Sequence, residues 1–343
     1  MEVHTNALTL TGQVSNAVIG GGSGSSTDIT VTGNTTLTGS ANGGSAVIGL
    51  LGTTTNATYN VKFTGTGDLS LQGGDGGVNP GSAHIGAGSN HTNPTVDINV
   101  KAANITLTGG NNGGGAFIGN SNNQTNAQGQ PAVGGGDISV AATAGNLVMN
   151  TSADALTRSA VRSVGGTHRS ISLSATGNID ATGGRLQSGG NLTTTSGVNT
   201  TFGLTTVGGN LLATATGDIT NAQPVSVTGA GSLNMTAGGA ITVNGDVTTA
   251  GGLITLDAAT TLTNNATISN GGISNTANIV LRANAFDIDG TAGAGQVQGG
   301  NAPVVLNPHT NTNTLAVVSP GGVGTTTVAQ SDLDAIHTTN FVA

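Results

Sequence analysis

The chain has 343 residues and a formal net charge of −8, from 7 basic and 15 acidic side chains. Nucleic acid is therefore disfavoured as a partner, because neutralising phosphates requires clustered lysines and arginines. The absence of cysteine excludes disulfides and cysteine-ligated zinc. Since the sequence has no run of about 20 apolar residues, we expect no membrane insertion.

A tetrapeptide pattern, Ala-x-Ile-Gly, recurs along the first third of the chain. Its isoleucines are 29 to 37 residues apart. Self-similarity at this period is typical of a solenoid, in which each repeat stacks on the previous one and cannot bury its apolar face alone. The four copies are Ala17-Val18-Ile19-Gly20, Ala46-Val47-Ile48-Gly49, Ala83-His84-Ile85-Gly86 and Ala116-Phe117-Ile118-Gly119.

Two short runs of alternating apolar and polar residues lie between successive copies. Apolar residues at i and i+2 predict strands that are buried on one side only, and Gly, Asn and Thr lie where the chain must turn. The 60 glycines make a helical alternative poor. We therefore predict an all-β fold, a parallel β-solenoid with about three short strands per coil. The paired runs are 28–31 and 36–39, 61–63 and 69–71, 98–100 and 105–107, 138–140 and 147–149, and 171–173 and 179–181.

The second half of the chain keeps this pattern with a shorter period. Gly-containing corners precede Leu192, Leu211, Leu233 and Ile254, which lie at intervals of 19 to 22 residues, and Ile279 and Val304 continue the series at intervals of 25 residues. We expect a region 1–188 with long Gly/Asn-rich loops. A region 189–343 with shorter coils is expected to continue the same solenoid and to include a short helical segment near 331–336.

The first residues match the middle of a later repeat. Asn6–Gly12 (Asn-Ala-Leu-Thr-Leu-Thr-Gly) parallels Ala103–Gly109 (Ala-Asn-Ile-Thr-Leu-Thr-Gly). Because solenoids need capped ends, we expect this chain to be a fragment of a larger repetitive protein.

Several segments carry a resemblance to one family. Ala-x-Ile-Gly followed by Gly-rich sequence and Asp-Ile-x-Val resembles the repeats of large bacterial exoproteins of the filamentous haemagglutinin type. The corner Gly209-Asn210-Leu211, the run Gly239-Ala240-Ile241-Thr242-Val243 and the segment Ser331-Asp332-Leu333-Asp334-Ala335-Ile336 resemble the same proteins.

This resemblance implies a right-handed parallel β-helix that is secreted to the cell surface of a Gram-negative bacterium. Such proteins pass an outer-membrane transporter, as two-partner secretion substrates or autotransporter passengers, and many are adhesins in attachment or biofilm formation. The implied partner is a host or bacterial surface receptor or glycan. The family's N-terminal secretion domain and a C-terminal translocator are not visible in the sequence, so the export route stays open.

Most of the aspartates lie at strand starts and are scattered along the coils. β-Helical enzymes that act on polysaccharides need paired carboxylates or acidic clusters, and only 2% of the residues are aromatic. We expect the aspartates to satisfy backbone groups at corners. We therefore predict no catalytic, cofactor-binding or metal-binding residues. The aspartates at strand starts are Asp28, Asp68, Asp97, Asp137, Asp180, Asp218 and Asp246.

Four further patterns receive a structural interpretation. Asp287-Ile288-Asp289-Gly290 resembles part of a calcium loop but lacks the Glu and the spacing of an EF-hand. His84, near His91, is expected at a variable outward position. The cluster Arg158, Arg162, Arg169 and Arg185 is expected to be a solvated edge patch. Thr-x-Thr pairs such as Thr106/Thr108 fit an ice-binding ladder one by one, but many equivalent coils lack them.

Three functional hypotheses follow. The leading one is a non-enzymatic segment of a secreted adhesin, with contacts expected first on the loops of residues 1–136. The second is a passive stalk that holds a binding domain at a distance. The third, disfavoured by the scarcity of charge and aromatic residues, is a polysaccharide-degrading enzyme.

Overall fold

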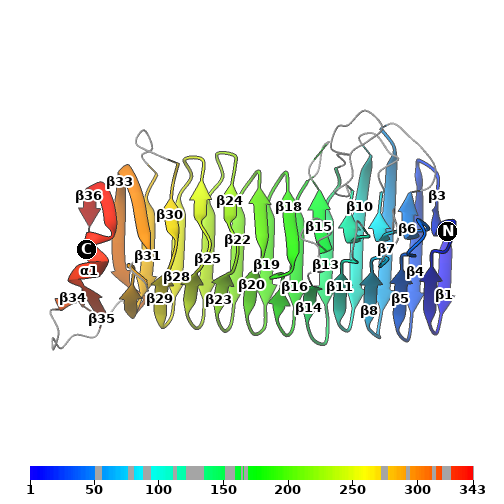
Figure 1. Ribbon diagram of the computed structural model, residues 1–343, viewed down its shortest axis with the longest axis horizontal. Helices are drawn as coiled ribbons and strands as arrows, with labels where there is room; N and C mark the ends of the chain where they lie inside the picture. The colour runs from blue at the N-terminus through cyan, green and yellow to red at the C-terminus, as the bar shows by residue number, and fades with distance from the viewer. Residues whose placement is uncertain are drawn as a thin grey trace. The chain divides into compact units, whose positions relative to one another are not determined.

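Stacked coils of parallel β-strands make up the protein in the computed structural model (Figure 1). Each regular coil contributes one strand to each of three walls, so the predicted parallel β-solenoid with three strands per coil is confirmed. The chain divides into two compact units, Met1–Gly190 and Asn191–Ala343. The structure describes residues 1–50, 56–75, 81–87, 94–110, 114–120, 135–150, 159–163, 165, 169–271, 277–290, 294–310, 314–318 and 326–342.

In the unit Met1–Gly190, every third strand belongs to the same wall. The first wall consists of β1 (Glu2–Thr5), β4 (Ser25–Val31), β7 (Thr58–Gly65), β10 (Thr95–Ala102), β13 (Ile138–Ala142) and β16 (Ile171–Ala175). The second consists of β2 (Leu8–Thr11), β5 (Thr35–Thr38), β8 (Leu69–Gln72), β11 (Ile105–Thr108), β14 (Leu147–Asn150) and β17 (Ile179–Asp180). The third consists of β3 (Ala17–Gly21), β6 (Ala46–Leu50), β9 (Ala83–Gly86), β12 (Ala116–Gly119), β15 (Ser159–Ser163) and β18 (Gly184–Ser188).

The unit Asn191–Ala343 repeats this order. Its first wall consists of β19 (Leu192–Ser196), β22 (Leu211–Ala215), β25 (Leu233–Ala237), β28 (Ile254–Ala258) and β31 (Ile279–Ala283). The second consists of β20 (Thr200–Phe202), β23 (Ile219–Asn221), β26 (Ile241–Val243), β29 (Thr261–Asn264) and β32 (Ala285–Asp287). The third consists of β21 (Leu204–Val207), β24 (Val225–Val227), β27 (Val247–Thr249) and β30 (Thr267–Ser269).

The last coils are less regular. The long strand β33 (Gln296–Pro308) pairs with β30 near its start and with β31 near its end, so it turns from the third wall into the first. A short helix, α1 (Gln330–Asp334), lies where a helical segment near 331–336 is expected. The remaining strands are β34 (Leu315–Val318), β35 (Thr326–Ala329) and β36 (Ile336–Val342).

Apolar side chains form columns inside each unit, because equivalent residues of successive coils are strictly in register. The first-wall column of the first unit runs Ile29, Phe63, Val100, Val140 and Leu173. The third-wall column runs Ile48, Ile85, Ile118, Val161 and Leu186. All of these side chains are at most 1% exposed. In the second unit the predicted series is also in register, at Leu192, Leu211, Leu233, Ile254, Ile279 and Val304.

Steric contact between coils explains why the Ala-x-Ile-Gly motif ends in glycine. Gly86 has φ of +129°, a backbone conformation that residues other than glycine rarely adopt. A Cβ atom at Gly86 would lie 2.0 Å from the carbonyl oxygen of Gly119 in the next coil, and one at Gly49 would lie 1.9 Å from that of Gly86. The motif thus marks a column of glycines in which the backbone of one coil lies directly against the backbone of the next.

Polar side chains form hydrogen-bonded ladders at the corners between strands. Asn104 Oδ1 accepts from the backbone N–H of Asn146 at 2.9 Å, and Asn146 Oδ1 accepts from that of Asn178 at 2.7 Å. In the second unit, Asp218 Oδ1 accepts from the N–H of Ala240 at 2.7 Å. The predicted corner role is confirmed for four aspartates, Asp97, Asp137, Asp218 and Asp246. Each accepts a hydrogen bond from a backbone N–H of the next coil and not from its own turn.

We predict that Gly86→Ala lowers the free energy of unfolding by about 2 kcal/mol or more, because it combines an unfavourable φ with a backbone clash. Urea unfolding followed by circular dichroism measures this loss. Gly22→Ala is the matched control, since a Cβ atom there meets no atom within 4 Å. Equal stability of the two variants would contradict the steric account.

We predict that Asn146→Ala lowers the free energy of unfolding by about 1 kcal/mol, because the N–H of Asn178 loses its acceptor. Asn146→Asp keeps an acceptor oxygen and should retain most of the stability, as Asp218 does at a corner of the second unit, where its Oδ1 accepts from the N–H of Ala240. The same urea titration compares the two variants. A loss of the same size in both would show that the hydrogen bond is not the cause.

Candidate functional site

A polar cleft of about 240 Å³ lies over the N-terminal ends of three first-wall strands. β4, β7 and β10 have 7, 8 and 8 residues, whereas β13 has only 5. β13 begins opposite Ile98, so Thr95–Asp97 extend past its start. The residues before β13 still pair with β10 here, through a parallel bridge between Thr95 and Gly135. The lining residues of the cleft are Gly24, Ser25, Thr58, Tyr59, Asn60, Thr95 and Asp97.

The polar side chains of the cleft stand in two register rows. Thr58 lies beside Thr95, and Asn60 lies beside Asp97. The side chains of Thr58, Asn60 and Thr95 make no hydrogen bond to any part of the chain that the structure describes. Asp97 Oδ1 accepts from the backbone N–H of Asp137 at 2.9 Å. The cleft therefore offers hydroxyl and amide groups that no described part of the chain uses as hydrogen-bonding partners.

Tyr59 lies between these outward residues and is directed inward. It is 2% exposed, and its hydroxyl group hydrogen-bonds the hydroxyl of Thr27. The turn that precedes β4 is tied to β7, because the N–H of Gly24 donates to the carbonyl of Thr58 at 2.8 Å. The cleft is thus built on strands and on a buried side chain.

A second cluster joins two sequence segments singled out separately, 287–290 and 331–336. One carboxylate oxygen from each of Asp287, Asp289 and Asp332 lies within 4.8 Å of the other two. Asp332 is 2% exposed, and its two oxygens accept from the backbone N–H groups of Ile288 at 2.5 Å and Ala329 at 2.7 Å. Among the described residues these three could hold a metal ion, because hard divalent cations favour carboxylate oxygens. The hydrogen bonds of Asp332 also give it a structural role.

The proximity of the three carboxylates affects their ionisation. Burial raises the pKa of Asp287 above its ordinary value, and the negative charges of Asp332 and Asp289 raise it further. The N–H of Gly290 opposes this shift by hydrogen bonding. Ionising Asp287 therefore costs more free energy in the folded chain than in the unfolded chain.

The expected solvated patch of arginines is wrong for one member. Arg162 stands in register with Gly119, at the end of the glycine column, and is only 7% exposed. Burial, together with the charge of Arg185, lowers the pKa of Arg162 to about 10, which leaves it protonated at neutral pH. Arg169 is exposed, as expected, and Arg158 lies outside the described residues.

His84 lies on the outer side of its wall, as expected, but it is buried. The equivalent Val18 is 36% exposed, but His84 and Phe117 are 3% and 4% exposed. The His84 Nε2 atom lies 2.9 Å from the carbonyl oxygen of Gly119, and the His84 and Phe117 rings meet edge to face with centroids 6.2 Å apart. The outer side of β9 and β12 is therefore covered. His91 lies outside the described residues.

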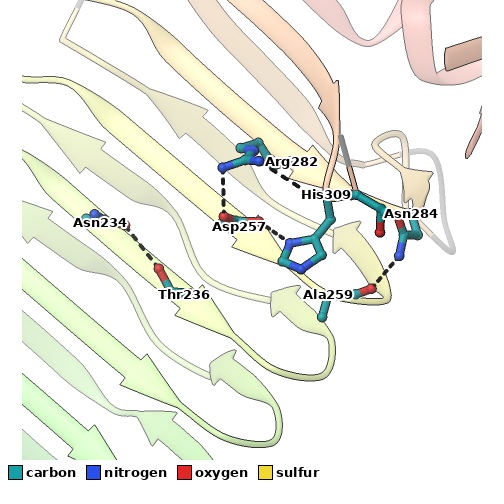
Figure 2. A network of polar contacts seen from close by, with 8 residues as sticks. Asn234, Thr236, Asp257, Ala259, Arg282, Asn284 and His309 are labelled. Carbon is teal, nitrogen blue, oxygen red and sulfur yellow. Dashed lines mark hydrogen bonds and ion pairs between the residues drawn. The ribbon is translucent and has the colours of Figure 1, made fainter. Parts of the chain in front are cut away.

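An ion-pair network crosses the first wall of the second unit (Figure 2). Asp257 on β28 accepts from Arg282 on β31 at 3.2 Å and lies 2.6 Å from Nδ1 of His309. Arg282 also donates to the carbonyl of His309 at 3.3 Å. Nearby, Asn284 donates to the carbonyl of Ala259 at 2.7 Å. Each charged side chain of this network links two coils, so the network indicates a role in stabilising the stack of coils.

No site residue was predicted from the sequence, and the cleft was missed. A signal was present, because alternation begins earlier than the Asp-Ile-x-Val pattern in these coils, at Thr58-Tyr59-Asn60-Val61 and Thr95-Val96-Asp97-Ile98. The pairing of residues 287–289 with Asp332 had no signal, since the cluster depends on how the last coils fold. Contacts were expected first on the loops of residues 1–136, and residues 51–55, 76–80, 88–93, 111–113 and 121–134 of this range lie outside the described residues.

No described helix is both long and apolar enough to span a membrane. Comparison with protein-family models, with curated proteins and with solved structures gives no match for this chain. The resemblance to exoproteins of the filamentous haemagglutinin type therefore stays a prediction from the repeat pattern.

We predict that Asp287→Asn raises the melting temperature at pH 7, with a gain of under about 1 kcal/mol because the Asp287 carboxylate is partly solvated. A carboxyl whose pKa is raised on folding favours the folded state below its unfolded pKa, about 3.8, and loses that contribution as the pH rises through the raised value. The gain should therefore disappear near pH 3. Melting curves from pH 3 to 7 test this. A pH-independent effect of Asp287→Asn would contradict the electrostatic cause.

Proposed function

We propose that this chain is a non-enzymatic segment of a secreted bacterial adhesin and that its β-helical walls mediate attachment or biofilm contacts. The observation that carries the proposal is the polar cleft of β4, β7 and β10. Thr58, Asn60 and Thr95 have unused hydrogen-bonding groups there, on strands held by the coils on both sides. A binding surface of this kind costs little conformational entropy when a partner binds.

The cell-surface location belongs to the same proposal. It rests on the resemblance of the Ala-x-Ile-Gly repeats to bacterial exoproteins, and it includes passage through an outer-membrane transporter and a surface receptor or glycan as the partner. The repeats agree with such a role because a stacked solenoid presents one long outer surface on each wall.

A passive stalk is the second candidate function. The corner ladders favour it, because Asn104, Asn146 and Asp218 link one coil to the next in both units without any relation to the cleft. Such ladders stiffen a repeat array whether or not it binds a partner.

The acidic cluster gives little support to the enzymatic alternative. Glycoside cleavage needs one carboxyl group as an acid and another as a base or nucleophile. Both oxygens of Asp332 already accept backbone hydrogen bonds, and Asp289 lies only two residues from Asp287. These contacts support a role in holding α1 against the loop after β32.

The proposal is tested by binding of the purified, fluorescently labelled chain to bacterial cells, host-cell surfaces and a panel of glycans and matrix proteins. An adhesin segment should bind saturably. The absence of binding by a folded, β-rich sample would contradict the proposal and favour the stalk. Release of oligosaccharides from polysaccharides incubated with the chain would favour the enzyme.

A further inference from the structure

We propose that the cleft formed by β4, β7 and β10 binds one uncharged sugar ring of a glycan; this deepens the proposed attachment function and rests on it. The inference starts from the arrangement of its polar groups. Neighbouring strands lie about 4.8 Å apart and alternate residues of one strand about 6.6 Å apart. Thr58, Thr95, Asn60 and Asp97 therefore occupy the corners of a small rectangle on the outer face of the wall.

The chemistry of these corners matches a polyhydroxylated ligand. A sugar hydroxyl both donates and accepts, and so do the threonine hydroxyls and the Asn60 amide. Asp97 uses Oδ1 for the N–H of Asp137, which leaves Oδ2 to accept from a ligand hydroxyl. Hydrogen bonds to a carboxylate are stronger than those between neutral groups, so Asp97 is the expected anchor.

The charge of the cleft selects against ionic ligands. Its lining includes one carboxylate and no lysine or arginine. Lys62, two residues after Asn60, is 2.8 Å from Asp28 and is engaged there. A sulfated or sialylated sugar would meet Asp97 without a compensating cation, and a single carboxylate is too few ligands for a divalent cation.

The size of the cleft limits the ligand to one ring. At about 240 Å³ it is slightly smaller than the roughly 300 to 1,000 Å³ of pockets that enclose drug-sized molecules. Tyr59 is buried and therefore supplies the floor and not an exposed face on which a second ring could stack. One ring in an open cleft binds weakly, in the millimolar range of dissociation constants, so multivalent display is needed to detect it.

The test uses the full chain coupled to beads and an array of glycans with uncharged, sulfated and sialylated termini. The best uncharged glycan is then titrated against variants by ligand-observed NMR. Asn60→Ala and Thr95→Val should each weaken binding about tenfold, because each removes a ligand hydrogen bond. Asn99→Ala is the matched control, an exposed asparagine on β10 that does not line the cleft, and it should bind as the parent does.

Circular dichroism melting should show unchanged stability for Asn60→Ala, since its side chain makes no hydrogen bond to the described chain. If Asn60→Ala is destabilised, Thr95→Val provides the binding test instead. Cell attachment that persists in both variants would overturn the cleft proposal and leave the attachment function standing. Preference for a sulfated or sialylated terminus would overturn the uncharged class. Failure of the parent chain to attach to any surface would overturn the proposed function and the cleft proposal together.

Discussion

Every coil of this protein must satisfy the backbone hydrogen bonds of the coil before it, and this requirement sets the register of all the walls within each unit. Residues that share a wall position therefore lie directly over one another, about 4.8 Å apart. The consequence is a column for every position: Ile48 on Ile85 on Ile118 inside the third wall, and Asn104 on Asn146 on Asn178 at a corner. Each column repeats one type of interaction.

Column packing explains which substitutions the repeat tolerates. Gly49, Gly86 and Gly119 lie where a carbonyl group of the next coil occupies the space of a Cβ atom. The motif ends when Arg162 takes the next place in the column, and its long side chain becomes buried there. The change of residue type in the sequence thus coincides with a change of packing. In the sequence this change is visible only as the end of the repeat.

The walls were predictable because they depend on local alternation, whereas the sites depend on what covers or approaches a wall. Alternation at Ile98-x-Val100 and Ile105-x-Leu107 fixes one buried face, and the structure confirms it. The burial of His84 and Arg162 on the other face depends on their surroundings, which have no period in the sequence. The acidic cluster depends on a return of the chain that brings Asp332 to Ile288. Such contacts between distant segments leave no mark on either segment alone.

The cleft combines both kinds of information. Its floor and rows come from regular strands, so the positions of Thr58, Asn60, Thr95 and Asp97 are fixed by the same register that builds the core. The polar columns at the corners use their side-chain hydrogen bonds to link one coil to the next, as Asn146 does with Asn178. The three neutral residues of the cleft do not. A column whose polar groups stay unused adds little to stability, and its hydrogen-bonding capacity is available to a partner from outside the chain.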